Sequence, residues 1–572
     1  TQGMISPMTT PKRRTHRKSV SEQVENINAS PINLSQRNIL NALTEINNEN
    51  GDESVVENDN MIRDGTDDAN IRHANIDENT NIIDNERIST LQKVENAISI
   101  SLIILEQIIS SITILLPKSI INVCTMLSKF IFTFFRTNNE KYNEFINETD
   151  NEKLGDEVLH KVEQLRNFES FQKIAELNGF ISESHLVPTQ DGFKLTIHRL
   201  DPTKNGFKSN NRAVYFQHGL LMTSDVWCVM FNKDDNLPFR LCELGFDVFL
   251  GNNRGNKYSN KHEKYNPNDV EFWNFSIDEF AMYDIPSSIN YILKLKNIEK
   301  LIYIGFSQGC SQILSSVSIN DDLNNKIEKL VLIAPATTPK KLSNWLINSI
   351  INFDPELIYK LFGKKILMKS VLFWRNITYP PMFIKLIDLP NDLLFNWKSK
   401  NIDIIQKLIS YYHLYSTTSV KCVVHWFQII KSKKFQMYQE RDYFQPFEYP
   451  TSETIKISKI LIIYGMNDSL VDIDILINQL PEFNNQTITQ IKDGKIVGKK
   501  KIYDNVEVII ENDDDEEYGY GDNNSETEVI KVNSSDKLNE LRVFGINGYE
   551  HLDLLWGKNM NENVIQNVIE FL

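Results

Sequence analysis

One serine in this chain has the surroundings of a catalytic nucleophile. The pentapeptide Gly-Phe-Ser-Gln-Gly at 305–309 follows an apolar, β-prone run at 300–304, and a helical pattern begins at Cys310. Strand, Gly-x-Ser-x-Gly and helix in this order are typical of a nucleophile elbow, where the glycines permit a tight turn that exposes the serine hydroxyl. A turn without chemistry could carry the same pentapeptide, but the flanking strand and helix favour catalysis. We therefore predict that Ser307 attacks a carbonyl carbon.

A serine hydroxyl is a weak nucleophile and needs a base within hydrogen-bond reach, itself oriented by an acid. In folds built around this elbow, the acid and then the histidine follow the serine, each after a later strand. Asp468 comes after the penultimate predicted strand, at 460–464. His551 is the only one of the ten histidines that follows the last predicted strand, at 541–546. We predict a triad of Ser307, Asp468 and His551, although Asp472 or Asp474 could replace Asp468.

The reaction also needs two N–H donors that stabilise the negative oxygen formed during attack. The backbone N–H of Gln308, directly after the nucleophile, is one candidate. The other is the N–H of Leu220, in the loop after the early predicted strand 213–217. His218 in the same loop lies too early in the chain to be the base, and we expect it to brace the loop.

The elements that must position these residues alternate between strand and helix. Short apolar runs predict strands at 193–200, 213–217, 246–250, 301–304, 330–333, 460–464 and 541–546. Helical patterns lie between them, for example at 277–293. This alternation predicts a mostly parallel sheet with helices on both faces, which is the α/β-hydrolase fold when combined with the elbow. We assign residues 138–572 to this domain.

Two stretches of the predicted domain interrupt the alternation. Residues 338–450 look helical and rich in aromatic residues, as expected of a cap over an active site for an apolar substrate. Aromatic residues are also ordinary core material. Residues 482–541 are rich in lysine and then acidic, and we expect a mobile insertion without chemistry.

The N-terminal part has a different character. Residues 1–90 are polar and rich in asparagine, which predicts a disordered leader. Residues 91–137 hold two apolar stretches separated at Pro117, and Glu106 lies on a polar stripe of the first. A charge near mid-span is costly in a bilayer, so we predict a hairpin anchored in one leaflet of a membrane or in a lipid-droplet monolayer. Two full membrane spans or a buried helical pair are the alternatives.

Composition narrows the possible partners and the compartment. The net charge of −15 argues against a nucleic-acid partner, because a phosphate backbone would be repelled. Five scattered cysteines form neither a metal-binding spacing nor a disulfide framework. The polar first ninety residues do not resemble a secretory signal. These features predict a catalytic domain that faces the cytosol and needs no metal and no cofactor.

Several blocks of sequence resemble the signatures of the acid lipase family, which includes gastric and lysosomal lipases and fungal steryl ester hydrolases. These blocks lie at 218–221, 251–256, 272–276, 305–309 and 549–553. Three further runs resemble the sterol esterases of yeast lipid droplets in particular: 220–227, 414–421 and 424–428. The resemblance covers about 95–480 and 540–560. Phe306 stands where the luminal lipases have histidine, so we do not carry over their acidic pH optimum.

The resemblance implies a cap-covered α/β hydrolase that cleaves steryl esters to sterol and fatty acid at the surface of a lipid droplet or of the endoplasmic reticulum. A triacylglycerol lipase is the first alternative. A catalytically inactive lipid-binding or tethering protein is an alternative of another class. Acyl transfer to a sterol is a more distant one, because the same acyl-enzyme could react with an alcohol if water were excluded.

Overall fold

The computed structural model describes residues 152–339, 355–367, 380–440, 445–492, 495–503, 506–511 and 539–572, together with isolated positions at 123, 126, 127, 130, 348, 351–352, 375 and 378. The predicted leader at 1–90 lies outside these residues. So does the predicted hairpin at 91–137, except for four helical and exposed residues: Val123, Met126, Leu127 and Phe130. Within the described part of the chain, no helix has the length and apolar character needed to cross a bilayer.

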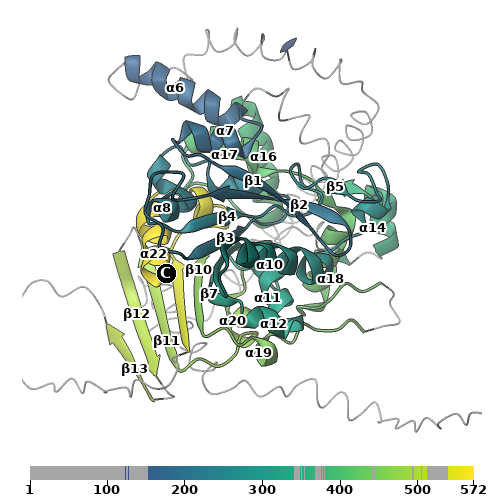
Figure 1. Ribbon diagram of the computed structural model, residues 1–572, viewed down its shortest axis with the longest axis vertical. Coiled ribbons are helices and arrows are strands. Elements are labelled where there is room, and N and C mark those ends of the chain that lie inside the picture. The colour runs from purple at the N-terminus through teal and green to yellow at the C-terminus, as the bar shows by residue number, and fades with distance from the viewer. Residues whose placement is uncertain are drawn as a thin grey trace, which may run out of the picture.

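One large, mostly parallel sheet forms the centre of the molecule (Figure 1). Its parallel strands are, in spatial order, β4 (Asp247–Leu250), β3 (Ala213–Gln217), β6 (Leu301–Phe306), β7 (Ile327–Ile333), β10 (Lys459–Gly465), β14 (Glu540–Ile546) and β11 (Asn485–Lys492). β3 and β6 are buried along their whole length, which explains their uninterrupted apolar sequences. All seven predicted strands are present, and the predicted mostly parallel α/β sheet is confirmed.

Antiparallel strands extend both edges of this sheet. They are β1 (Glu183–Pro188), β2 (Phe193–Leu200) and the short β5 (Lys261–His262) at one edge, and β12 (Lys495–Tyr503) and β13 (Val506–Glu511) at the other. In the central region, Ile304 of β6 lies between Phe216 of β3 and Val331 of β7. The carboxyl ends of the parallel strands therefore lie at the same end of the sheet, and the predicted catalytic loops begin there.

Helices cover both faces of the sheet. Outside the cap they are α6 (Glu152–Asn167), α7 (Phe171–Leu177), α8 (Leu237–Glu243), α9 (Ile277–Glu279), α10 (Ile285–Lys296), α11 (Gln308–Ile319), α12 (Asp321–Asn324), α19 (Thr451–Thr454), α20 (Ile473–Asn478), α21 (Asp553–Trp556) and α22 (Gln566–Phe571). Short 3-10 or π turns are η1 (Ser224–Trp227), η2 (Lys233–Asp235), η3 (Glu271–Trp273), η4 (Phe280–Asp284) and η5 (Asn561–Ile565). In Figure 1, α10 and α11 lie on one face, whereas α8 and α22 lie on the other.

The predicted cap region connects β7 to β10 and is mainly helical where it is described. Its elements are α14 (Pro355–Phe362), β8 (Ile366–Leu367), α16 (Pro380–Phe395), α17 (Ile404–Leu414), β9 (Thr418–Ser419) and α18 (Val420–Ser432). Several of its aromatic side chains, including Trp397, Tyr411 and Trp426, are buried. Some of these aromatic residues therefore serve as packing material, as ordinary core residues would.

The prediction that 482–541 is a mobile insertion is wrong for its first half. β11 pairs with β14 in parallel from Asn485 to Ile491, and β12 continues the sheet beside it (Figure 1). The apolar signal of β11 is weak because Gln486, Thr489 and Gln490 occupy buried positions along it. The acidic run at 512–517 lies outside the described residues.

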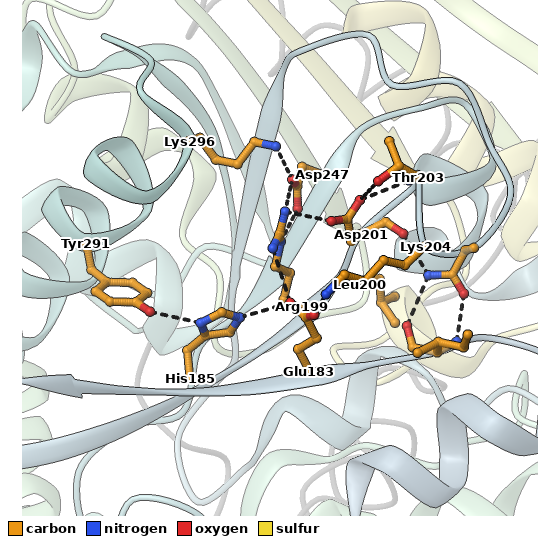
Figure 2. Close-up of polar contacts among 12 residues, drawn as sticks. Glu183, His185, Arg199, Leu200, Asp201, Thr203, Lys204, Asp247, Tyr291 and Lys296 are labelled. Atoms are coloured by element: carbon orange, nitrogen blue, oxygen red, sulfur yellow. Dashed lines mark hydrogen bonds and ion pairs between the residues drawn. The ribbon is translucent and has the colours of Figure 1, made fainter.

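A partly buried ion cluster around Asp247 joins the β1, β2 and β4 strands at one side of the sheet (Figure 2). Arg199 on β2 donates two hydrogen bonds to Asp247 on β4, at 2.7 and 2.8 Å. The same guanidinium contacts Glu183 on β1 at 3.1 Å, and Lys296 of α10 reaches Asp247 at 2.5 Å. Asp247 thus pairs with two cations, Arg199 and Lys296, and these contacts join β2, β4 and α10.

Candidate active site

The predicted nucleophile lies in a strained turn between β6 and α11. Ser307 has φ 52° and ψ −117°, a conformation that L-residues avoid unless the surrounding structure enforces it. Its N–H donates to the Ile333 carbonyl at 2.9 Å. A Cβ atom on Gly309 would lie 2.3 Å from the carbonyl oxygen of Gln217, so this position requires glycine. The local geometry is therefore that of a nucleophile elbow.

The three predicted triad residues lie together. The Ser307 Oγ is 2.8 Å from His551 Nε2, and His551 Nδ1 is 2.6 Å from Asp468 Oδ2. All three side chains are buried. A carboxylate only accepts hydrogen bonds, so the proton of neutral His551 belongs on Nδ1, which leaves Nε2 free to accept the serine proton. The arrangement can generate a serine alkoxide equivalent and return the proton later.

The Asp468 side chain is held in place by a hydrogen bond within its own loop. The second carboxylate oxygen of Asp468 accepts from the N–H of Leu470 at 2.9 Å. Asp472, which the sequence left open as an alternative, instead caps α20 by accepting from the N–H of Ile475 at 3.3 Å. Asp474 lies in the first turn of the same helix. The structure therefore brings Asp468 to His551 and uses Asp472 for a local cap.

The two predicted oxyanion donors flank the nucleophile. Gln308 follows it directly, and a Cβ atom on Gly219 would lie 3.1 Å from the Cβ of Ser307, so the loop that carries Leu220 lies against the serine. Within the described residues, neither the Gln308 nor the Leu220 backbone N–H donates to another protein group. Both donors are thus available to a developing oxyanion.

The oxyanion loop is held in place from behind. His218 Nε2 accepts from the N–H of Asn253 at 3.1 Å, and its Nδ1 bonds the Gly219 carbonyl at 2.8 Å. Burial lowers the pKa of His218 to about 4, so the ring stays neutral and can accept at one nitrogen while donating from the other. As predicted from its early place in the chain, His218 braces the loop.

A buried carboxylate next to the same loop joins it to the cap. Asp225 of η1 contacts Lys257 at 2.5 Å, the Tyr258 hydroxyl at 2.8 Å and His413 of α17 at 3.5 Å. Burial alone would raise the pKa of Asp225, but Lys257 and His413 hold it well below its usual range. The carboxylate is therefore held by Lys257 and Tyr258, and α17 lies beside it at His413.

The cap also contacts the residue after the nucleophile. Trp426 of α18 donates its indole N–H to the side-chain oxygen of Gln308 at 2.7 Å, and the Cys422 thiol lies 3.4 Å from the same oxygen. Because an indole N–H is only a donor, this contact fixes the orientation of the Gln308 amide. In the sequence, Trp426 belongs to the aromatic-rich stretch and to the run 424–428, and neither signal linked it to Gln308.

A second cap residue, Trp397, packs against the ring of His551 and was likewise missed as a part of the site. Its only sequence signal was that it belonged to the aromatic-rich stretch. Within the described residues, no group of three or more histidine, cysteine or acidic side chains could hold a metal ion. The polar groups at the site are those of acyl transfer by a serine.

Comparisons with known proteins agree with this geometry. Residues 212–495 match a model of the α/β-hydrolase fold, and 171–231 match a partial α/β-hydrolase lipase region. Two probable lipases of Schizosaccharomyces pombe are 44% and 38% identical, covering 58% and 68% of this chain and 75% and 84% of theirs. Human gastric triacylglycerol lipase is 31% identical, over 53% of this chain and 80% of its own.

Proposed function

The chain belongs to the acid lipase family of α/β hydrolases and is a carboxylic ester hydrolase, and from this premise we propose that it cleaves steryl esters to sterol and fatty acid. The observation that carries the catalytic part is the continuous hydrogen-bond chain from Ser307 through His551 to Asp468. An inactive lipid-binding protein would have no need for this chain, nor for the strained backbone at the serine.

In the proposed reaction, the Ser307 oxygen attacks the ester carbonyl while His551 Nε2 takes the hydroxyl proton. Asp468 stabilises the resulting imidazolium, and the N–H groups of Leu220 and Gln308 bind the tetrahedral oxyanion. Collapse breaks the bond to the alcohol, which leaves with the proton from His551. Water then attacks the acyl-serine and gives one proton to His551. Collapse of this second intermediate releases the fatty acid, and His551 returns the proton to the Ser307 oxygen.

The choice of steryl ester rests on sequence resemblance. The runs at 220–227, 414–421 and 424–428 resemble yeast sterol esterases. The first two meet beside the site, where Ser416 donates its N–H to the Leu221 carbonyl at 2.5 Å. The similarity to gastric triacylglycerol lipases favours the alternative substrate, a triacylglycerol. Both substrates are neutral lipid esters and use the same chemistry.

Fatty-acid release from cholesteryl oleate and triolein emulsions tests the substrate directly. We expect the purified protein to cleave cholesteryl oleate faster than triolein, and also to cleave a soluble short-chain ester. Faster cleavage of triolein would replace the steryl ester proposal with the triacylglycerol alternative. Cleavage of the soluble ester alone would reject both long-chain substrates while leaving the esterase chemistry intact.

We further propose that the protein works on a lipid-droplet or endoplasmic reticulum surface, with the catalytic domain in the cytosol. Four apolar residues in the second stretch of the predicted anchor support this, because in the sequence they recur at i, i+3, i+4 and i+7, the spacing of one helix face. They are Val123, Met126, Leu127 and Phe130, and they are 54–73% exposed. An apolar face of this kind lies naturally in a lipid interface.

Deletion of 97–135 tests the anchor. We expect the shortened protein to leave the membrane and droplet fractions while keeping its activity on a soluble ester, because the deleted residues precede the hydrolase domain. Quantitative flotation of both proteins with droplets is the measurement. A shortened protein that still floats with droplets would show that another part of the chain makes the attachment.

A further inference from the structure

The ring of the predicted catalytic base is covered by a tryptophan from the cap. The Trp397 and His551 rings are stacked, with centroids 5.0 Å apart and planes 5° from parallel. Phe306 approaches the same imidazole at 5.0 Å with a tilted ring. Trp397 and His551 are only 5% and 3% exposed, so water cannot replace this contact. The imidazole therefore becomes charged, during the proposed reaction, directly against an indole face.

The segment that carries Trp397, residues 395–401, is bonded to both catalytic loops. The N–H groups of Lys398 and Ser399 donate to the Glu550 carboxylate at 2.9 and 2.7 Å, one residue before the base. The Ser469 hydroxyl, one residue after the acid, donates to the Phe395 carbonyl at 2.7 Å. The segment thus links the loop of the acid to the loop of the base.

This segment also has an unfavourable backbone. Asn396 and Ser399 have φ values of 57° and 49°, which place two non-glycine residues in the left-handed region within four positions. Such conformations persist where the surrounding contacts enforce them, and they gather at functional sites. The strain is maintained by bonds at both ends, including that of the Asn401 amide to the Gly548 carbonyl at 2.6 Å.

An indole ring has a negative face that attracts a cation within about 6 Å of the ring centroid. The charged groups around the His551 imidazole are the Asp468 carboxylate at 2.6 Å from Nδ1 and, within two residues along the chain, Glu550 and Asp553. The carboxylate of Asp553 accepts from the Glu550 N–H at 2.7 Å. Trp397 thus adds a cation-stabilising surface to the ring face, where no carboxylate contact is formed in the described structure.

We propose that Trp397 is a positioning residue that holds the His551 ring in the plane of the Ser307–Asp468 chain and stabilises its imidazolium form. The inference rests on the proposed function of the triad. It assigns to the cap a direct part in acid–base chemistry, in addition to covering the substrate. Displacement of the 395–401 segment would then lower the reaction rate without any change in the triad residues.

Trp397→Leu tests the proposal on a soluble short-chain ester. We expect the plateau of kcat/KM to fall about tenfold, and the midpoint of its acid limb to move to lower pH by up to about one unit, because the protonated ring loses a stabilising face. Trp397→Phe keeps an aromatic face and should restore most of both values. Titration of His551 followed by NMR should move in the same direction and does not depend on turnover.

Phe395→Leu is the matched control, because Phe395 stacks on Trp397 at 4.4 Å and belongs to the same segment. Burial raises the pKa of the nearby Asp553 to about 6. Asp553 is present in both variants, so it does not explain a difference between their acid limbs. We expect a lower melting temperature but an unmoved acid limb. Equal losses in Trp397→Leu and Phe395→Leu, with both acid limbs unmoved, would overturn the proposal. If the wild-type protein cleaved no ester, but the His551 titration still differed between wild type and Trp397→Leu as expected, only the proposed function would be overturned.

Discussion

Replacing Ser307 with alanine should reduce kcat on every ester by about a millionfold, the scale at which a serine nucleophile is lost from a triad. The hydroxyl oxygen forms the acyl-enzyme bond, and no other group bonded to His551 Nε2 in the described structure could replace it. Hydrolysis of a soluble ester, followed in the purified variant, measures the loss. The melting temperature should stay within a few degrees of wild type, because only one buried oxygen is removed.

Ser315→Ala is the matched control for this variant. Ser315 is buried in α11, the helix that begins directly after the nucleophile, and its hydroxyl donates to the Ser311 carbonyl at 2.7 Å. The control therefore loses one buried hydroxyl from the same element and should keep its activity. If Ser307→Ala hydrolysed esters as fast as Ser315→Ala, the nucleophile would have to be another residue.

The parts of the site that were predictable depend on local sequence. The elbow needs only a buried strand, two glycines around a serine and a helix, all within about twenty residues, and the uninterrupted apolar run of β6 marks the strand. Asp468 and His551 were found by chain order, because loops at the carboxyl ends of parallel strands meet at one edge. The strand β11 was missed because its buried face is largely polar.

The cap contacts were not predictable for a different physical reason. Trp426 lies 118 positions from Gln308, and nothing in the residues between them predicts that an indole N–H will meet that amide. Trp397 lies between two left-handed residues, Asn396 and Ser399, and local preference disfavours this conformation for the serine. Tertiary contacts override local preference here, and strained positions are where sequence reasoning is expected to fail.

Asp468→Asn should lower kcat on a soluble ester by about ten thousandfold while the protein stays folded. Asparagine can keep the bond from the Leu470 N–H, since its amide oxygen still accepts. Its NH₂ group would then donate to His551 Nδ1, which forces the remaining ring proton onto Nε2. A protonated Nε2 cannot accept the Ser307 proton, so the base is held in the wrong tautomer.

Asp472→Asn supplies the matched comparison, because it makes the same chemical change four residues away. Its amide oxygen can still accept from the Ile475 N–H and cap α20, so we expect wild-type activity and a melting temperature within a few degrees of wild type. Active-site titration with a phosphonate ester separates slow chemistry from a misfolded fraction in both proteins. Loss of activity in Asp472→Asn with an active Asp468→Asn would reject the acid assigned here, because the 2.6 Å contact to His551 would then have no catalytic role.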